Sequence, residues 1–159
     1  MTDIIFREAT LADLPVLKEF EQGVVQAERP FNPMIRDADV TYYDLAALIE
    51  STDACVIVAE ADGTIVASGY VKIIASEPCF VHDRHAYLGF MYVAPAARRQ
   101  GLNQRILTRL VEWASARGIP DCYLDVYAAN TGAISAYEKF GFKPNVVEMR
   151  LDNTRRSDD

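Results

Sequence analysis

Apolar positions along the chain follow two patterns, one with the helical spacing of three or four residues and one of short continuous runs typical of strands. The clearest helical stretch extends from Gln100 to Arg117, where Leu102, Ile106, Leu110 and Ala114 recur every four residues. The glycine and proline that follow are helix-ending signals. We therefore expect the best-defined helix of the protein here.

The same two patterns predict nine further elements. Helices are expected over residues 10–28, 39–51 and 130–141, and strands over residues 4–8, 54–60, 64–76, 85–93, 121–127 and 145–152. Thr10 and Asp13 form a capping-box pattern at the first helix. Asp62 and Gly63 join two β-branched runs and predict a tight hairpin, and Gly89 is a candidate bulge.

The order of these elements predicts the fold class. Strands and helices mix along the chain, so we expect an α/β (α+β) protein with one mixed sheet and helices on its faces. With 159 residues, of which half are hydrophobic, the chain is long enough for one core and short for two. We predict a single domain over residues 1–152 and a polar C-terminal tail over residues 153–159.

Charge and cysteine content narrow the class of partner. The formal net charge is −7, from 23 acidic and 16 basic side chains, which disfavours nucleic acid and anionic membranes. A cationic or amine partner fits this charge better.

Three separated cysteines predict no disulfide framework, and the sequence shows no leader or membrane span. We expect a soluble, cytoplasmic protein.

The residues before the Gln100–Arg117 helix suggest anion binding. No Ser, Thr, Asp or Asn stands between Val93 and Leu102 to cap the helix. Arg98 and Arg99 instead add positive charge at the positive end of the helix dipole. Together with Gly101, these features are typical of a phosphate site, although the arginines could also be solvated surface charge. No P-loop or dinucleotide fingerprint is present.

Two motifs resemble those of the GNAT superfamily of N-acetyltransferases. The stretch "VAPAARRQGLNQRIL" is similar to the family's acetyl-coenzyme-A motif at Val93, Pro95, Arg98 and Gly101, and departs from it at Asn103. A second stretch, "NTGAISAYEKFGF", is similar to the family's later motif, and its matching residues are Asn130, Ala133, Tyr137, Gly141 and Phe142.

The resemblance implies a GNAT-like fold, a mostly antiparallel twisted sheet whose central strands splay apart with acetyl-CoA lying between them. We expect no metal. The positions that it assigns to acetyl-CoA are Met91, Tyr92, Val93, Arg98, Arg99, Gln100, Gly101, Leu102, Asn103, Asn130, Ala133 and Tyr137. We expect the Asn103 side chain to donate to a phosphate oxygen or to have no effect. The family has two strands after its last helix, whereas this chain has room for one, so we expect an incomplete sheet edge and a possible homodimer.

The resemblance further implies direct acetyl transfer to a primary amine of a small molecule or peptide. Tyr137 is the expected general acid for the departing thiolate, because a phenol needs only modest tuning for this role; otherwise it is a core aromatic residue. Asp125 and Glu148 are candidate bases or site-lining acids, as are Glu77, Asp83 and His85. By analogy, the acceptor would meet Glu28, Arg29 and Phe31 in the loop after the first helix.

Three alternatives remain at this point. The chain could be a non-catalytic module that binds or senses coenzyme A or acyl-CoA. It could bind nucleic acid through Arg98, Arg99, Arg105 and Arg109, against its net charge. Cys79, His82 and His85 have the spacing of zinc ligands, but no second cluster completes a site.

Overall fold

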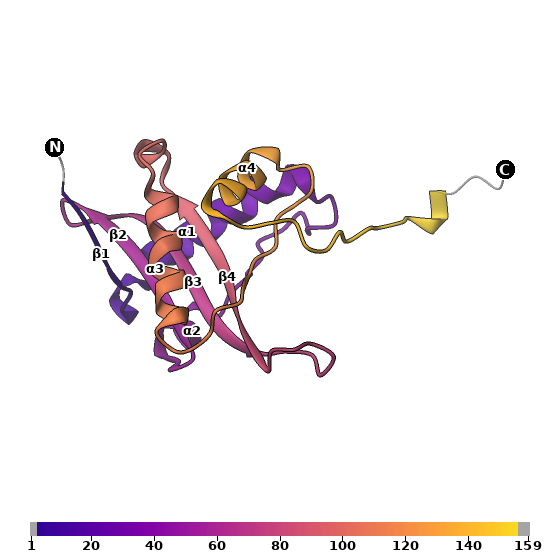
Figure 1. Cartoon of the computed structure of the whole chain (residues 1–159). Helices are drawn as coiled ribbons and strands as arrows, with labels where there is room; N and C mark the ends of the chain where they lie inside the picture. The colour runs from indigo at the N-terminus through magenta and orange to yellow at the C-terminus, as the bar shows by residue number, and fades with distance from the viewer. Residues whose placement is uncertain (1–2, 156–159) are drawn as a thin grey trace. The chain divides into compact units, whose positions relative to one another are not determined.

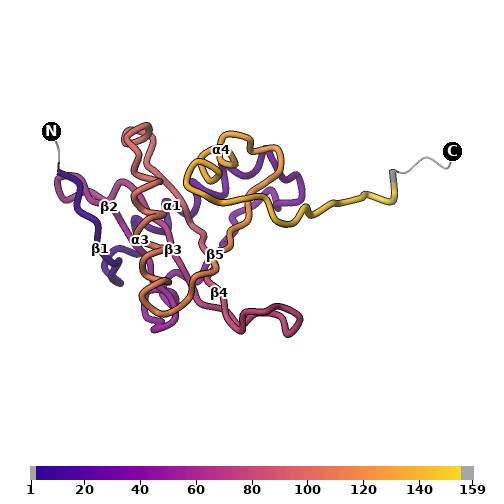
Figure 2. The backbone as a smooth tube through the Cα atoms, in the orientation of Figure 1, coloured from indigo at the N-terminus to yellow at the C-terminus, as the bar shows by residue number. Residues whose placement is uncertain are grey.

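The computed structural model describes residues 3–155 and divides into two compact units, Met1–Asp125 and Val126–Asp159, which we describe separately. The first unit contains a five-stranded sheet with strand order β1-β2-β3-β4-β5. Its strands are β1 (Ile4–Glu8), β2 (Ala54–Ala61), β3 (Thr64–Ala75), β4 (Arg84–Val93) and β5 (Cys122–Tyr123). Figure 1 labels the first four strands, and Figure 2 also labels β5. The first four strands pair antiparallel, and β5 pairs parallel to β4.

Helices cover both faces of this sheet. They are α1 (Leu14–Glu28), α2 (Leu45–Glu50) and α3 (Leu102–Ser115), with 3-10 turns at Leu11–Asp13, Arg29–Phe31 and Pro95–Ala97. In Figure 1, α3 lies in front of the sheet, and α1 and α2 lie behind it. The helical spacing seen in the sequence explains this, because Leu102, Ile106 and Leu110 are all buried on the inner side of α3.

The core between the sheet and helices α1 and α2 is aromatic and aliphatic. Leu17 and Phe20 of α1 and Leu45 of α2 pack with buried side chains of the strands, namely Val56, Val58, Tyr70 and Phe90. The mixed sheet with flanking helices confirms the predicted fold class.

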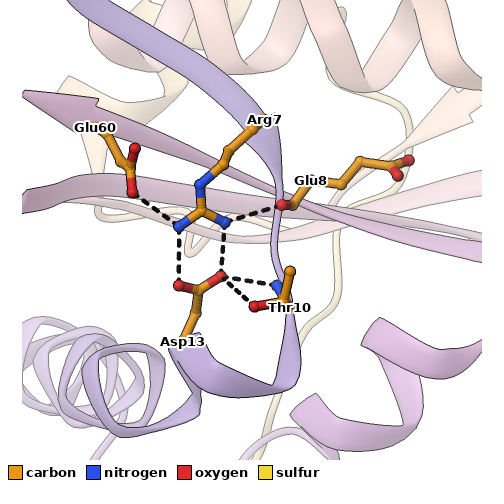
Figure 3. A network of polar contacts seen from close by, with 5 residues as sticks. All are labelled: Arg7, Glu8, Thr10, Asp13 and Glu60. Atoms are coloured by element: carbon orange, nitrogen blue, oxygen red, sulfur yellow. Dashed lines mark hydrogen bonds and ion pairs between the residues drawn. The ribbon is translucent and has the colours of Figure 1, made fainter. Parts of the chain in front are cut away.

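An ionic cluster joins the first strand to the first helix (Figure 3). The Arg7 guanidinium on β1 contacts both carboxylate oxygens of Asp13, at 2.7 and 2.9 Å, and Glu60 of β2 at 2.9 Å. Asp13 also accepts a hydrogen bond from the Thr10 backbone N–H at 2.7 Å. The capping box expected at these residues is therefore present.

Strand β4 contains a bulge immediately after Gly89. Gly89 lies opposite Tyr70 and Tyr92 lies opposite Ser68, so two residues of β4 face Gly69 alone. One of them, Phe90, has a φ of 58°, and its carbonyl accepts a hydrogen bond from the Ser68 hydroxyl at 3.1 Å. A bulge of this kind bends the strand and increases its local twist.

The second unit contains α4 (Thr131–Phe140) and a 3-10 turn at Asn153–Arg155. Gly141, with a φ of 129°, ends α4. Two strands expected from the sequence differ in the structure. The strand expected over residues 121–127 is limited to β5, and residues 145–152 form no strand although their apolar pattern predicts one.

Within residues 3–155, no helix has both the length and the apolar character needed to cross a membrane. The single domain expected over residues 1–152 and the cytoplasmic location stay predictions.

Candidate active site

The loop between β4 and α3 has a backbone suited to anion binding. Arg99 and Gly101 have φ values of 66° and 73°, both in the left-handed region. Such turns orient successive N–H groups toward one side of the backbone. α3 begins directly afterwards, and no side chain caps its first turn in the part of the chain that the structure describes. The absent cap expected from the sequence is thus confirmed.

The two arginines of this loop differ in their contacts. The Arg98 side chain folds back, and its Nε donates to the Val93 carbonyl oxygen at 3.0 Å, while its guanidinium lies 5.9 Å from the centre of the Tyr92 ring. Arg98 therefore braces the loop. Arg99 and Gln100 are exposed, and Asn103 is half-buried. A ligand at the start of α3 would meet these side chains and the backbone of Gly101.

The sheet is open beside the second half of β4. The register of β4 with β5 covers only two pairs, Ala86 with Cys122 and Tyr87 with Tyr123. The residues of β4 that follow the bulge, Met91 to Val93, have β3 on one side and no strand on the other among the described elements. An open strand edge is a template for an extended ligand, and this edge leads to the anion-binding loop.

Four tyrosines, one of them Tyr42, and a lysine are among the residues that line a pocket of about 640 Å³ on the first unit. Tyr43, Tyr70 and Tyr87 form a row, with ring centres 5.5 Å apart for the first two and 6.5 Å for the last two. The Lys72 ammonium lies 5.7 Å from the Tyr70 ring and 5.6 Å from the Tyr87 ring. Gly89 makes room for this row, because a Cβ atom there would lie 2.7 Å from the Tyr70 ring.

Asp125 belongs to the same cluster, because its carboxylate accepts a hydrogen bond from the Tyr87 hydroxyl at 2.8 Å. Burial raises the pKa of Tyr70 to about 12, and the charge of Asp125 adds to the effect. Burial, and then the bond to Asp125, also raise the pKa of Tyr87. Both phenols therefore stay protonated at neutral pH and can donate hydrogen bonds.

The other candidate bases, Glu77, Asp83 and His85, lie outside the tyrosine cluster. Glu77 and Asp83 are exposed in the turn between β3 and β4. His85 joins His82 through Ser76, whose hydroxyl lies 2.7 Å from Nδ1 of His82 and 2.8 Å from Nδ1 of His85. The His82 Nε2 atom contacts the Tyr123 hydroxyl at 2.8 Å. Across residues 3–155, no group of three or more His, Cys, Asp and Glu side chains is arranged to hold a metal ion.

The expected acceptor loop is held by its own contacts. The Arg29 guanidinium donates to the carbonyl oxygens of Arg36 and Ala38, at 2.7 and 2.9 Å. Burial raises the pKa of Glu28, and a hydrogen bond with Tyr42 opposes this. Phe31 is half-buried. Arg29 thus holds the conformation of the loop. The role of Glu28, Arg29 and Phe31 in binding an acceptor stays a prediction.

The residues proposed from the second motif lie in the second unit. The Asn130 side chain accepts a hydrogen bond from the Ala133 N–H at 3.3 Å and so caps α4. The Tyr137 ring packs edge-on against Phe142, with 6.0 Å between ring centres. Glu148 is exposed on residues 145–152. Because the two units are described separately, the expected approach of Tyr137 to β4 stays a prediction, as do the acetyl-CoA contacts of Asn130 and Ala133.

Sequence reasoning missed the row of tyrosines. Tyr70 and Tyr87 are 17 positions apart in the chain, and they become neighbours only through the register of β3 with β4. The bulge after Gly89 sets that register for the rest of the strand. The Asp62-Gly63 turn identified the hairpin of β2 and β3, and Gly89 marked the position of the bulge, but no sequence signal gave the register that places Tyr70 opposite Gly89.

Comparisons with known proteins agree on one family. The model of the acetyltransferase (GNAT) family matches residues 22–142. Glucosamine 6-phosphate N-acetyltransferase 1 of Oryza sativa subsp. japonica is 33% identical over 134 residues, which cover 81% of this chain and 76% of that protein. The ribosomal protein bS18-alanine N-acetyltransferase of Escherichia coli (strain K12) is 40% identical over 55 residues, which cover 35% of this chain and 37% of that protein.

A solved structure supports the fold. A crystal structure of a predicted acetyltransferase with acetyl-CoA from Clostridium acetobutylicum has a TM-score of 0.71 at 20% identity. The match covers 97% of this chain and 99% of that one.

Proposed function

Because the chain belongs to the acetyltransferase (GNAT) family, we propose that it transfers an acetyl group from acetyl-CoA directly to a primary amine of a small molecule or a peptide. The names of the rice and Escherichia coli relatives specify an amino sugar phosphate and a protein alanine. Both acceptors are amines, one on a small molecule and one on a protein, so the proposal includes small-molecule and peptide acceptors.

The observation that carries this proposal is the continuity of the open β4 edge with the uncapped start of α3. Residues 91–93 offer backbone groups to an extended arm, and Arg99, Gln100, Gly101, Leu102 and Asn103 offer N–H groups and charge to a phosphate. Arg98 holds this loop through the Val93 carbonyl oxygen. These residues therefore fit coenzyme A, whose thioester supplies the activated acyl carbon.

We assign the acceptor to the tyrosine-lined pocket. Its protonated hydroxyls can orient a polar acceptor. The Asp125 carboxylate accepts a hydrogen bond from Tyr87 of this pocket and supplies a negative charge. We propose that Asp125 accepts a proton from the amine, directly or through water.

We propose that the Tyr137 hydroxyl donates a proton to the departing thiolate. A covalent acyl-enzyme is not part of the proposal, because burial raises the pKa of the Cys122 thiol and so disfavours the nucleophilic thiolate. Transfer then occurs in a complex that holds both substrates together.

A thiol-release assay with acetyl-CoA and a panel of amines tests this function. The panel contains amino sugars, a polyamine, and peptides with free N-terminal or lysine amines. We expect turnover with at least one class, and a fall in kcat of about 100-fold in Tyr137→Phe. Tyr123→Phe is the control, because that hydroxyl contacts His82 in the first unit. Tight acetyl-CoA binding without turnover of any amine would contradict the enzyme and favour the coenzyme-binding module.

A further inference from the structure

Lys72 places a positive charge on the face of the sheet that carries the aromatic core. It lies on β3, the central strand, opposite Ala54 of β2 and Tyr87 of β4. Side chains two positions apart on a strand share a face, so Lys72 points to the same face as Tyr70 of the core. Its side chain is half-buried. Charged residues are uncommon in such surroundings unless a partner of opposite charge is present.

No carboxylate forms an ion pair with the Lys72 ammonium in the part of the first unit that the structure describes. Its contacts are with two aromatic rings, whose centres lie 5.7 Å away for Tyr70 and 5.6 Å away for Tyr87. Cation–π contacts replace only part of the water that a half-buried ammonium loses. The three N–H donors of the ammonium are therefore available to a ligand that enters the pocket.

Lys72 is the one cationic side chain among the described residues that line the tyrosine-lined pocket. Two aspartates, Asp44 and Asp53, also line it, and both are exposed. The Asp44 carboxylate accepts the Ala47 N–H at 3.1 Å and caps α2. The volume of about 640 Å³ is typical of a site for a small molecule. An anionic group that enters this pocket would meet an opposite charge at Lys72.

The Tyr87 side chain connects Lys72 to a negative charge. The ammonium of Lys72 lies against the Tyr87 ring, and the Tyr87 hydroxyl donates to the Asp125 carboxylate at 2.8 Å. A cation and an anion therefore contact different parts of one tyrosine side chain. The ammonium group of a substrate is repelled by Lys72 and attracted by Asp125. A small molecule with an amine at one end and an anionic group at the other matches both charges.

We propose that Lys72 selects acceptors that carry a carboxylate or phosphate group a few bonds from the amine. Lys72 binds the anionic group, and the amine lies toward Asp125. The ammonium donates charge-assisted hydrogen bonds to the anion, and such bonds are about twice as strong as neutral ones. The inference rests on the proposed acetyl transfer and adds to it the chemical class of the acceptor.

Matched acceptors that differ in one charge test this class. The pairs are γ-aminobutyrate with its carboxamide, phosphoethanolamine with ethanolamine, and a peptide with aspartate in second position with its asparagine counterpart. Thiol release at saturating acetyl-CoA gives kcat/KM for each acceptor. We expect the anionic member of at least one pair to have a kcat/KM at least tenfold higher. The first two pairs distinguish a carboxylate from a phosphate, and putrescine, which adds a second cation, should be a poorer acceptor than γ-aminobutyrate.

Variants of Lys72 test the residue through the ratio of kcat/KM within a pair. Lys72→Met keeps an apolar stem of similar length and should reduce the ratio to about threefold or less. Lys72→Glu should favour putrescine over γ-aminobutyrate. A merely structural role would lower kcat/KM for both members of a pair and leave the ratio unchanged.

The matched controls are Lys18→Met and Lys18→Glu. Lys18 is exposed on α1, and these variants change the net charge by the same amounts as those of Lys72. Both should keep the wild-type ratio. Circular dichroism checks that all four variants are folded.

The outcomes separate this inference from the proposed function. Equal kcat/KM within every pair, or thiol release only with amines that lack an anionic group, would overturn the class of acceptor and leave acetyl transfer standing. A ratio that survives in Lys72→Met, or that is lost equally in Lys18→Met, would overturn the role of Lys72. No thiol release with any amine would overturn the proposed function itself, and this inference with it.

Discussion

Gly101 occupies a backbone conformation that other residues adopt only under strain. Its φ is 73°, and a Cβ atom at this position would meet no atom within 4 Å. Glycine is therefore required by the backbone conformation and not by a lack of space. The space around Gly101 is free, as is expected of a loop that receives a ligand.

Gly101→Ala should weaken acetyl-CoA binding, because a left-handed alanine costs about 1–2 kcal/mol and the loop relaxes away from the geometry that aligns its N–H groups. Isothermal titration with acetyl-CoA measures the effect, which should be about tenfold. Gly132→Ala is the matched control, since a Cβ there also meets no atom and its φ is outside the left-handed region. Equal losses in both variants would contradict this role for Gly101.

Asn103 is the one residue of the loop that departs from the family motif. Its half-buried side chain stands in the first turn of α3, where an amide N–H can reach an anion. We expect Asn103→Ala to leave acetyl-CoA binding unchanged or to weaken it by up to about tenfold, the value of one hydrogen bond to a charged group. Tenfold stronger binding, measured by the same titration, would show that the asparagine obstructs the site.

The Tyr87 hydroxyl connects the pocket to Asp125. Tyr87→Phe removes this hydrogen bond and should raise KM for the amine by about 3–10-fold, which corresponds to one hydrogen bond of roughly 1 kcal/mol. The dissociation constant of acetyl-CoA should not change. Steady-state kinetics with Tyr123→Phe as control separate this effect from a general loss of stability, and an unchanged KM would remove the pocket from the acceptor site.

Residue patterns pointed to the candidate anion-binding loop but not to the candidate acceptor pocket. The loop is contiguous along the chain, so the absent cap, the arginines and Gly101 stand together in the sequence and point to one ligand. The pocket combines Tyr43 of a loop, Tyr70 of β3 and Tyr87 of β4. Their proximity depends on the register of β3 with β4, and no local pattern in the sequence encodes that register.

At the scale of elements, capping residues marked helix ends correctly where they were present. Thr10 with Asp13 marks the start of the first helical region, and Asn130 and Gly141 mark the two ends of α4, in both sequence and structure. The helix expected over residues 39–51 is shorter in the structure. The Asp44 side chain caps the first turn of the helix, so α2 begins at Leu45. The Glu21 carboxylate accepts the N–H groups of Tyr42 and Tyr43, at 3.0 and 2.7 Å, and holds the preceding residues as a loop. Such a long-range contact overrides helical spacing.

The junction of β1 with α1 should give stability a dependence on acid. Hydrogen bonds from Arg7, opposed by burial, lower the pKa of Asp13 to about 2, compared with 3.8 for an unperturbed group. The carboxylate therefore stabilises the fold fully above about pH 4, and the contribution is lost as the pH falls through the folded-state pKa. Asp13→Asn should lower the free energy of unfolding at pH 7 by about 1–3 kcal/mol.

Urea unfolding between pH 2 and pH 7 checks this, with Asp37→Asn in an exposed loop as the control. The loss in Asp13→Asn should shrink toward pH 2, where about half of the wild-type carboxylates are themselves protonated. A loss that is constant across this range would mean that Asp13 acts through its shape and not through its charge.

At the scale of the whole molecule, the two proposed substrates would meet opposite fields. The net charge of −7 would attract a cationic amine over long range. The anionic coenzyme would instead be received locally, where Arg99 lies at the positive end of α3. Separate fields of this kind suit an enzyme that holds an anionic donor and a cationic acceptor at once.

This arrangement predicts a salt dependence that differs between acceptors. Raising the ionic strength from about 0.01 M to 0.15 M shortens the Debye length from about 30 Å to 8 Å and screens the long-range attraction. At saturating acetyl-CoA, kcat/KM for a cationic amine should fall several-fold. An aromatic amine of low pKa, which is neutral at the assay pH, should show little change. Stopped assays over a salt series measure both, and a parallel decline for the two acceptors would place the effect in the protein and not in the steering of the amine.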